Sequence, residues 1–266
     1  MLSLISEVVA AFTPVKQTHT VLLLGTESSG KTALCVALAR LLARRSERSG
    51  GGRGAKGAGD DRGSIESLFE QVPVTTRTLG QNVVELETAS TVVTVWDVGG
   101  SEAIRPMWKH YVGEASKIVY VVDGRAAVED VERDIDILLD VVEVANPEED
   151  GTNEMNHEEA EGAIESPPTR NRTKPVLVLA TKMDAYDEEV STSRGSSQLS
   201  YKMDDVAMAG RLEAVATAFT KKVEEKRTRC GLLFNVEYRI KVLPVSCLDA
   251  EMVEDVLDWC LANPLV

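Results

Sequence analysis

Four residues near the start of the chain have the types and spacing of a phosphate-binding loop. In the stretch GTESSGKT, Gly25, Gly30, Lys31 and Thr32 fit the pattern G-x-x-x-x-G-K-[ST]. The apolar run TVLLL precedes the pattern and a helix-like run follows it, which is the context that this motif requires. We therefore expect the loop to hold the phosphates of a nucleoside triphosphate.

The residue choice in this loop follows from the chemistry of an anion site. The backbone N–H groups that can point inward around a phosphate are those of Glu27, Ser28, Ser29, Gly30, Lys31 and Thr32. The helix that begins at Gly30 adds the positive end of its dipole, and Gly25 and Gly30 give the backbone freedom for the curl. We expect Lys31 to reach the β- and γ-phosphates and the Thr32 hydroxyl to ligate Mg²⁺.

The stretch TKMD, later in the chain, indicates which base accompanies the phosphates. Asp184 can accept two hydrogen bonds from the N1–H and the exocyclic amine of guanine, a donor pair that adenine lacks. A lone Lys-x-Asp is also typical of a solvated loop. Here Thr181, Lys182 and Asp184 follow the apolar run PVLVLA, and ligands lie at the carboxyl ends of strands in parallel sheets. GTP or GDP is therefore the predicted ligand, and an ATP-using P-loop enzyme is a weaker alternative.

A third element, WDVGG, ends another apolar run. Asp97 suits a carboxylate that holds the metal through water, and Gly99 and Gly100 let the backbone approach a γ-phosphate. A plain strand-ending turn explains this stretch in isolation. The order of the three elements favours a nucleotide site.

Apolar runs alternate with helical patterns along the chain, and these must position the site. The expected strands are residues 20–24, 82–87, 91–97, 117–123, 175–180 and 238–246, and the expected helices are residues 30–45, 128–144, 205–226 and 251–262. Runs rich in β-branched residues and separated by helices predict a mostly parallel sheet covered on both faces, a doubly wound α/β fold.

Polar segments interrupt this alternation. The predicted organisation is an N-terminal amphipathic helix over residues 1–14 and one domain over residues 18–266, with flexible insertions at about 46–63, 146–168 and 186–205. Residues 1–12 fit docking either on protein or on a membrane surface as peripheral contact. The insertions are interpreted as solvated spacers, and a regulatory role for at least one is the alternative.

Composition excludes several classes of protein. The formal net charge of −14 over 266 residues argues against a nucleic-acid binder. Residue 2 is leucine, so N-myristoylation is not expected, and the start of the chain lacks a secretory signal. The cysteines, with no metal-like spacing, are interpreted as free thiols of a cytoplasmic protein; they are Cys35, Cys230, Cys247 and Cys260.

The sequence resembles the ADP-ribosylation factor-like small GTPases of the Arf/Arl family. The stretches that carry the resemblance are GTESSGKT, TLGQNVVELE, WDVGGSEAIRPMWKHY, TKMD and SCLDA. They extend over nearly the whole chain apart from the three insertions. The resemblance implies the P-loop NTPase small-GTPase fold, with a mostly parallel six-stranded sheet, helices on both faces and an antiparallel edge hairpin.

The resemblance also implies roles for individual positions. Thr78 matches the switch I threonine that ligates Mg²⁺ only with the γ-phosphate present, and Gly100 matches the switch II glycine whose N–H binds that phosphate. Ser246 and Cys247 match the loop that completes the guanine pocket. Residues 82–96 match the hairpin that slides in register between nucleotide states and is coupled to release of the N-terminal helix.

Four positions depart from the family pattern. Ser101 stands where the family has a glutamine and is too short to orient an attacking water, so we expect very slow intrinsic hydrolysis. Arg77, beside the switch threonine, is an ordinary solvated arginine in the simpler interpretation and an internal arginine finger in the alternative. Thr181 replaces an asparagine with little effect on guanine binding. Gln81 replaces an effector-contacting phenylalanine, although Trp96 and Tyr111 beside it are present.

The resulting prediction is a Mg²⁺-dependent GTP-binding switch and weak GTPase, with Lys31, Gly100 and Ser101 at the catalytic positions. Its expected partners are effectors, an exchange factor and an activating protein, in membrane, vesicle, ciliary or cytoskeletal traffic. Its expected location is cytoplasmic or peripheral on an intracellular membrane. The alternative from a different class is a GTP-bound scaffold that does not cycle.

Overall fold

The computed structural model describes residues 16–50, 73–144, 174–183, 205–230 and 240–264. Within them, six strands form one sheet in the order β2-β3-β1-β4-β5-β6. Their bounds are Gln17–Leu24 (β1), Gln81–Glu87 (β2), Thr91–Val98 (β3), Lys117–Asp123 (β4), Val176–Thr181 (β5) and Ile240–Pro244 (β6). Neighbouring strands are parallel except for β2 and β3, an antiparallel pair at one edge. The predicted fold class is confirmed.

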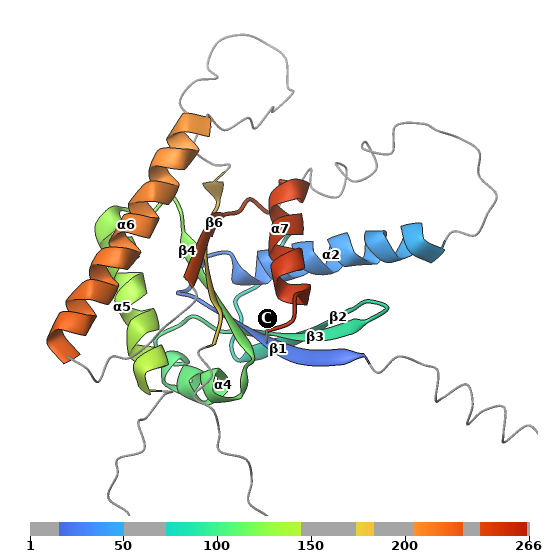
Figure 1. Ribbon diagram of the computed structural model, residues 1–266, viewed down its shortest axis with the longest axis horizontal. Coiled ribbons are helices and arrows are strands. Elements are labelled where there is room, and N and C mark those ends of the chain that lie inside the picture. Colours follow the sequence, from blue (N-terminus) through green and yellow to red (C-terminus); the bar gives the residue numbers. More distant parts are fainter. Residues whose placement is uncertain (1–15, 51–72, 145–173, 184–204, 231–239, 265–266) are drawn as a thin grey trace, which may run out of the picture.

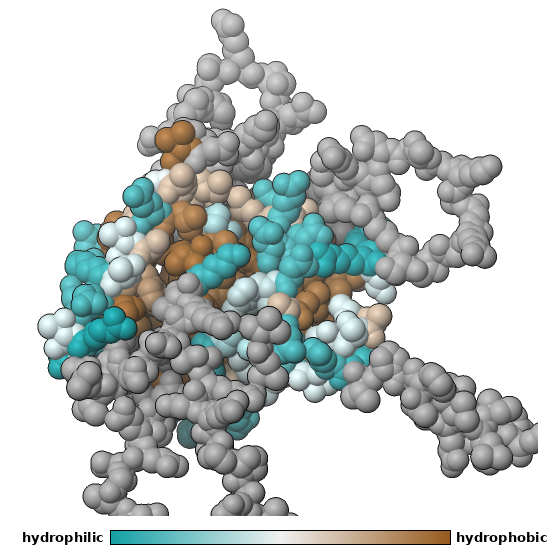
Figure 2. Space-filling model, viewed as in Figure 1, coloured by the Kyte–Doolittle hydropathy of each residue, from teal (hydrophilic) through white to brown (hydrophobic). Residues whose placement is uncertain are grey.

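Helices cover both faces of this sheet (Figure 1). Their bounds are Lys31–Gly50 (α2), Trp108–Glu114 (α4), Val128–Val144 (α5), Asp205–Cys230 (α6) and Ala250–Leu261 (α7), and the 3₁₀ turn Arg105–Met107 (η1) precedes α4. Because both faces are covered, β4 and β5 are almost continuously apolar and buried. Figure 2 shows hydrophilic side chains over the outer surfaces of α2 and α7, as expected for helices that bury one stripe.

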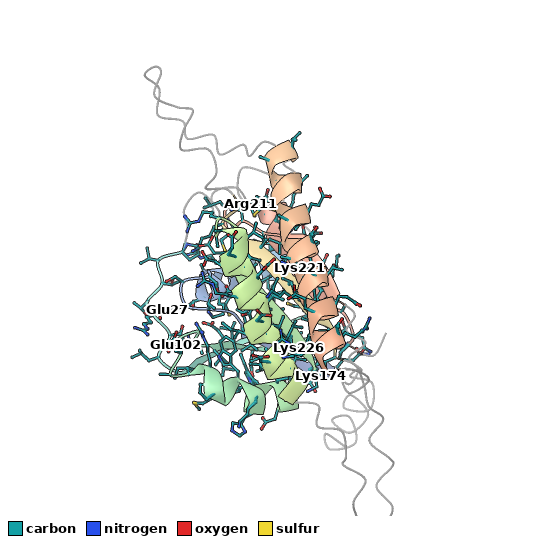
Figure 3. All side chains as sticks on the ribbon, turned by 90° about the vertical axis from the view of Figure 1, so that its left-hand side faces the viewer. Glu27, Glu102, Lys174, Arg211, Lys221 and Lys226 are labelled. Atoms are coloured by element: carbon teal, nitrogen blue, oxygen red, sulfur yellow. The ribbon has the colours of Figure 1, made fainter. Side chains whose placement is uncertain are left out.

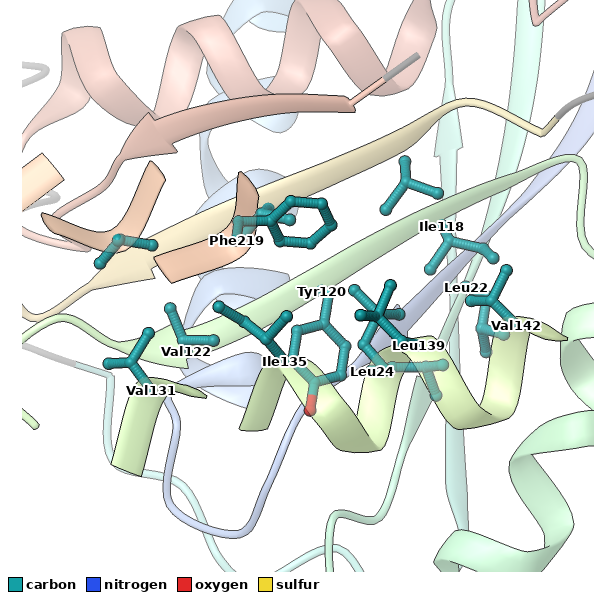
Figure 4. Close-up of a cluster of buried hydrophobic side chains, with 14 of the residues drawn as sticks. Leu22, Leu24, Ile118, Tyr120, Val122, Val131, Ile135, Leu139, Val142 and Phe219 are labelled. Atoms are coloured by element: carbon teal, nitrogen blue, oxygen red, sulfur yellow. The ribbon is translucent and has the colours of Figure 1, made fainter. Parts of the chain in front are cut away.

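Two apolar clusters, one on each face, hold the helices to the sheet. The first joins the sheet to α4, α5 and α6, and its fully or almost fully buried members include Tyr120, Ile135 and Phe219 (Figure 4). The second joins the opposite face to α2 and α7 through residues such as Leu34 and Val256. The strands are thus fixed between two layers, and the loops at their ends are held at defined positions.

A buried lysine fixes α7 at the amino end of the sheet. Lys117, at the start of β4, is 2% exposed and donates hydrogen bonds to the carbonyls of Trp259 (2.7 Å) and Ala262 at the end of α7. His19 Nε2 lies 2.7 Å from the carbonyl oxygen of Cys260. A cation at a helix C-terminus complements the negative end of the dipole. Burial lowers the pKa of Lys117 to about 8.

The helices α5 and α6 are linked by a row of ion pairs along their length. Lys221 contacts Glu132 at 2.6 Å, and the next pairs are Lys222 with Asp136 and Lys226 with Asp140. Figure 3 shows Lys221 and Lys226 on α6 where it runs beside α5. The helix α6 ends at Cys230, four residues beyond the predicted 205–226.

Some predictions on domain organisation fall on residues outside the described ranges. These are the N-terminal helix, predicted over 1–14, residues 51–63 of the first insertion, the insertion 146–168 and residues 186–204 of the third insertion. Residues 46–50 of the first insertion are helical in α2, because the helix continues through helix-compatible residues to the glycine run that begins at Gly50. No described helix is both long enough and apolar enough to cross a membrane. Among the described cysteine side chains, Cys35 and Cys260 are buried and Cys247 is half-buried, all as free thiols.

Candidate nucleotide-binding site

The predicted phosphate-binding loop joins the carboxyl end of β1 to the first turn of α2. Gly25 has a φ of 148°, and a Cβ there would lie 2.2 Å from the carbonyl oxygen of Val121 on β4, so only glycine fits. Ser28 also has a positive φ, 63°. The N–H of Leu34 donates to the carbonyl of Gly30, which places Gly30 at the start of the helix. The loop therefore curls at the position that the motif predicts.

Lys31 is buried within this loop. Its side chain amine donates to the carbonyls of Gly25 at 2.8 Å and Thr26 at 2.7 Å, and the residue is 6% exposed. Burial lowers the pKa of Lys31 to about 8, and nearby carboxylates, first that of Asp97, act in the opposite direction. A buried amine with a lowered pKa is suited to an anionic ligand, because the ligand's charge would restore the stability of the charged form.

Three oxygen-bearing side chains converge next to Lys31. The Thr32 hydroxyl donates to Asp97 Oδ2 at 2.8 Å and lies 3.1 Å from the Thr78 hydroxyl. Asp97 is fully buried, and its Oδ1 has no hydrogen-bond partner within the described part of the chain. Hydroxyl and carboxylate oxygens are the ligands that Mg²⁺ prefers, and an unpartnered buried carboxylate oxygen fits a hydrated cation. The residues present therefore fit the predicted magnesium site.

The end of β3 packs directly against the phosphate-binding loop. A Cβ at Gly100 would lie 2.4 Å from the carbonyl oxygen of Gly25 and 2.7 Å from the backbone nitrogen of Glu27, so a side chain there would collide with the loop. The N–H of Gly99 donates to the Gly80 carbonyl at 2.8 Å, which ties this turn to the segment before β2. Gly100 thus lies against the loop of residues 25–32.

Ser101 begins the turn that leads into η1. Its carbonyl accepts the N–H groups of Ile104 at 2.9 Å and Arg105 at 3.1 Å, and Arg105 Nε donates to the Gly100 carbonyl at 3.1 Å. These bonds involve the backbone of Ser101, and its short side chain offers one hydroxyl where a glutamine would offer an amide. The structure therefore places Ser101 in the turn between Gly100 and η1.

Arg77 lies across the rim of the same loop. Its Nε is 2.8 Å from the Glu27 carboxylate, and the two side chains are 58% and 45% exposed. Figure 3 shows Glu27 at the edge of the molecule that also bears Glu102, one residue after Ser101. The ion pair connects the segment before Thr78 to the phosphate-binding loop.

Residues predicted to bind the base lie at the ends of β5 and β6. The Thr181 hydroxyl donates to the Ser29 carbonyl at 2.6 Å, and Lys182 donates to the Ser28 carbonyl at 2.5 Å. Thus β5 is linked to the phosphate-binding loop by two side chains. Ser246 is buried after β6, and Cys247 is half-buried beside it. Asp184, the predicted guanine-binding residue, lies outside the described ranges.

Several residues of the site were not found by sequence reasoning. Asn82 Nδ2 donates to Asp97 Oδ2 at 3.2 Å, and the Thr26 hydroxyl donates to Asp134 Oδ2 on α5 at 2.9 Å. Burial raises the pKa of Asp134. Asp123, at the end of β4, accepts from Lys182 at 2.7 Å. Only Asp123 carries a sequence signal, because it ends an apolar run as Asp97 does.

Comparison with known proteins identifies the middle of the chain. Residues 65–148 match the model of the ADP-ribosylation factor family. Over 88 residues, or 32% of the chain, it is 39% identical to ADP-ribosylation factor J and 38% identical to ADP-ribosylation factor K, both of Dictyostelium discoideum. The predicted resemblance to the ADP-ribosylation factor family is confirmed. The Arf-family match contains Thr78, Asp97, Gly100 and Ser101, whereas the phosphate-binding loop lies outside it.

The extent of the Arf-family similarity is limited. The alignments span about half of the length of these curated relatives, 47% in each case. Among solved structures, the chain is similar to the Arl6 BBS3 small GTPase of Trypanosoma brucei with bound nucleotide analogue GppNp, at a TM-score of 0.46 and 18% identity. That alignment covers 92% of this chain and 95% of the other. Similarity at this level is too low to transfer a function.

The Arf-family segment also contains the predicted aromatic pair. The rings of Trp96 on β3 and Tyr111 on α4 meet edge to face, with centroids 5.9 Å apart. Gln81 is exposed at the start of β2, in register with Val98. The aromatic pair is therefore formed, with a polar residue where the family resemblance predicts a third aromatic ring.

Proposed function

We propose that this chain is a Mg²⁺-dependent guanine-nucleotide switch of the Arf type and a weak GTPase. The main support for the proposal is a convergence of side chains beside the curled loop that begins at Gly25. The residues that converge there are Lys31, Thr32, Thr78 and Asp97. Two of them come from the loop and α2, one from the segment before β2 and one from β3. A site assembled from three separate segments can change the position of those segments when its ligand changes.

The roles of the residues follow from their positions. Backbone N–H groups of residues 27–32 and the Lys31 amine would bind the phosphates. Thr32 and Thr78 would hold Mg²⁺ directly and Asp97 through water. When bound, the ion neutralises charge that develops on the phosphate oxygens. Because Thr78 and Gly100 lie in different segments, contacts that need the third phosphate would order both segments together.

The base specificity is proposed from Asp184 in the sequence, together with Thr181, Lys182, Ser246 and Cys247. The experiment is equilibrium binding of GTP, ATP and xanthosine triphosphate to wild-type protein and Asp184→Asn. Wild-type protein is expected to prefer GTP over ATP by at least about 100-fold, because a buried polar edge left unpaired is costly. In the variant, the asparagine amide can donate to the 2-oxo group of xanthine, so preference should move to xanthosine triphosphate. Selective ATP binding would contradict the proposal.

Slow hydrolysis is proposed from Ser101. Its hydroxyl is too short to orient the attacking water, so single-turnover hydrolysis without a partner should be slow. Ser101→Gln restores the amide and is expected to raise the rate at least about tenfold, a barrier change of about 1.4 kcal/mol. Equal rates in the two proteins would show that this position does not limit hydrolysis.

Partner binding is proposed from the family similarity and from exposed apolar side chains near the site. Val74 and Leu79 precede β2, Val83 lies in β2 and Met107 lies in η1, and their exposed fractions range from 47% to 101%. These segments adjoin Thr78 and Gly100, so nucleotide-dependent ordering would change the surface that effectors contact. Exchange and activating proteins are proposed on the same basis, in trafficking within the cytoplasm or at a membrane contacted through residues 1–12. An affinity capture comparing GTP-analogue-loaded and GDP-loaded protein tests this part.

A second candidate function is a GTP-holding scaffold that does not cycle. The serine at position 101 favours it, because the same substitution that slows hydrolysis prolongs the GTP-bound form. The nucleotide content of purified protein after incubation with Mg²⁺ distinguishes the two. GTP retained over hours supports the scaffold, and conversion to GDP supports the switch.

A further inference from the structure

We infer that Arg77 is a catalytic residue of this chain, an arginine supplied in cis that exchanges its Glu27 partner for the γ-phosphate of bound GTP. The inference rests on the proposed function and names a group that acts in the same site. Its starting point is that the arginine is paired with the phosphate-binding loop itself.

Two distances near Arg77 show how close it lies to the predicted site. Its neighbour Thr78 lies 3.1 Å from Thr32, in the predicted magnesium site. Its partner Glu27 has its backbone nitrogen 2.7 Å from the position that a Cβ on Gly100 would take. Arg77 is therefore adjacent in sequence to a predicted metal ligand and paired with a loop residue whose backbone lies against Gly100.

Other described cations near the loop are bound to backbone carbonyls or to the carboxylate at the end of β4. Lys31 donates to carbonyls within the loop, Lys182 pairs with Asp123 at the end of β4, and Arg105 donates to the Gly100 carbonyl. Arg77 differs from them because it pairs with the half-exposed carboxylate of Glu27 on the rim of the loop. Its guanidinium can be released without removing a backbone hydrogen bond of the loop.

The energetics favour the exchange of partners. An ion pair between two exposed side chains contributes little to stability, because water and salt screen it. A guanidinium binds phosphate oxygens through charge-assisted and frequently bidentate hydrogen bonds, which are stronger. The charge that Arg77 would meet grows toward the transition state, so its contribution is larger there than in the bound ground state.

The chemical role of Arg77 is electrostatic. Arg77 would transfer no proton and form no covalent bond; it would place positive charge beside the oxygens of the phosphoryl group while water replaces GDP on phosphorus. This differs from the role of the missing glutamine, which orients the water. Hydrolysis therefore remains slow in the presence of Ser101 and should become slower still without Arg77.

The test uses the full chain without any partner. GDP, Mg²⁺ and fluoroaluminate together mimic the planar phosphoryl group of the transition state, and their binding can be measured by intrinsic tryptophan fluorescence in the absence of turnover. Arg77→Ala is compared with Arg227→Ala, a matched control on α6 in which an arginine of similar exposure, 55%, also pairs with a glutamate. Affinity for GDP alone is measured for each protein.

The expected result is that wild-type protein and Arg227→Ala form the fluoroaluminate complex. Arg77→Ala should bind it at least about tenfold more weakly, while its GDP affinity changes by less than about threefold. Single-turnover GTP hydrolysis should fall in parallel. Glu27→Gln frees Arg77 and should strengthen the complex relative to GDP alone, and this gain should disappear in the double variant with Arg77→Ala.

Two results would overturn the inference while leaving guanine-nucleotide binding intact. One is equal fluoroaluminate affinity in Arg77→Ala and Arg227→Ala, and the other is a wild-type protein that binds GDP and does not form the complex. A folded wild-type protein that binds neither GDP nor GTP would overturn the proposed function as well.

Discussion

Two buried lysines at opposite ends of the sheet, Lys31 and Lys117, have similarly lowered pKa values but different surroundings. Burial lowers the pKa of Lys31 and of Lys117 to about 8, and each amine donates to backbone carbonyls. At Lys31, nearby carboxylates, chiefly that of Asp97, raise the pKa and so oppose the effect of burial. No described carboxylate raises the pKa of Lys117 in this way. The Lys117 amine instead lies 4.8 Å from the centre of the Trp259 ring.

The surroundings of the two amines fit the proposed ligand-binding role of Lys31 and a structural role of Lys117. The carbonyls that Lys31 contacts, those of Gly25 and Thr26, belong to the loop between β1 and α2, and under the proposed function phosphate oxygens would take their place. The carbonyls that Lys117 contacts end α7, which is held by its own apolar stripe. Under the proposed function, a buried amine therefore binds ligand at one end of the sheet and stabilises α7 at the other.

The largest expected effect is the loss of nucleotide binding in Lys31→Met. Hydrogen bonds from an amine to phosphates are charge-assisted, so GTP affinity should fall about 100-fold or more. The free energy of unfolding should change little, because loss of a desolvated charge offsets loss of its hydrogen bonds. Fluorescence competition and urea unfolding measure the two quantities. Reduced stability with unchanged GTP affinity would show that Lys31, like Lys117, has a structural role and would contradict its proposed role in binding.

The reciprocal change, Lys117→Met, should reduce stability without affecting the ligand. The carbonyls of Trp259 and Ala262 lose their donor and the helix dipole loses its cation, and removal of the desolvated charge offsets only part of this, so urea unfolding at pH 7 should show a loss of about 1 kcal/mol. GTP affinity should remain within about threefold of wild type. A nucleotide defect as large as that of Lys31→Met would show that the two ends of the sheet are coupled.

The pH dependence of the free energy of unfolding tests whether Lys117 is a buried charged group. The folded-state pKa of Lys117 is about 8, lowered from 10.5, so between these values the folded protein holds fewer protons than the unfolded chain. The free energy of unfolding contributed by this residue therefore rises with pH. From pH 7 to 9, wild type should gain about 1 kcal/mol over Lys117→Met.

The other groups that titrate nearby are common to both proteins. Lys31 titrates over the same range, and Cys35 and Cys260, whose pKa values are raised to about 12, oppose the trend above about pH 9. Lys117 also lowers the pKa values of His19 and Cys260, but His19 titrates mainly below pH 7 and Cys260 above pH 9, so the difference between pH 7 and 9 reports mainly on Lys117. A difference that stays flat or narrows with rising pH would contradict its burial as a charged group.

The smallest expected effect belongs to an exposed lysine. Lys221 on α6 pairs with Glu132 at 2.6 Å, and solvent screens the pair. Lys221→Ala should leave the urea midpoint and GTP affinity unchanged within error. A clear loss of stability would mean that the row of ion pairs between α5 and α6 acts cooperatively.

Local patterns account for much of what could be predicted from the sequence. The strands are short β-branched runs, and the loop of residues 25–32 needs glycine at a close approach and at a helix start, so spacing alone identifies it. Asp97 and Asp123 end such runs, which places them at the carboxyl edge of the sheet. The predicted fold class and the predicted elements near the phosphates depend on these local signals.

Contacts between distant segments could not be predicted. Thr26 and Asp134 are 108 positions apart, and Lys117 and Trp259 are 142 apart. Each residue alone is compatible with a solvated surface, and only the packing of α5 and α7 brings the pairs together. The pairing of Arg77 with Glu27 is of the same kind, because a loop has no periodicity that fixes where its side chains meet.

The most direct test of the central claim is a calorimetric titration of nucleotide-stripped, folded protein with GTP in the presence of Mg²⁺. The account predicts uptake at one site with a Kd of about 1 µM or tighter, weakened when the metal is chelated and lost in Lys31→Met. Absence of binding heat, in protein whose cooperative thermal unfolding proves that it is folded, would contradict it.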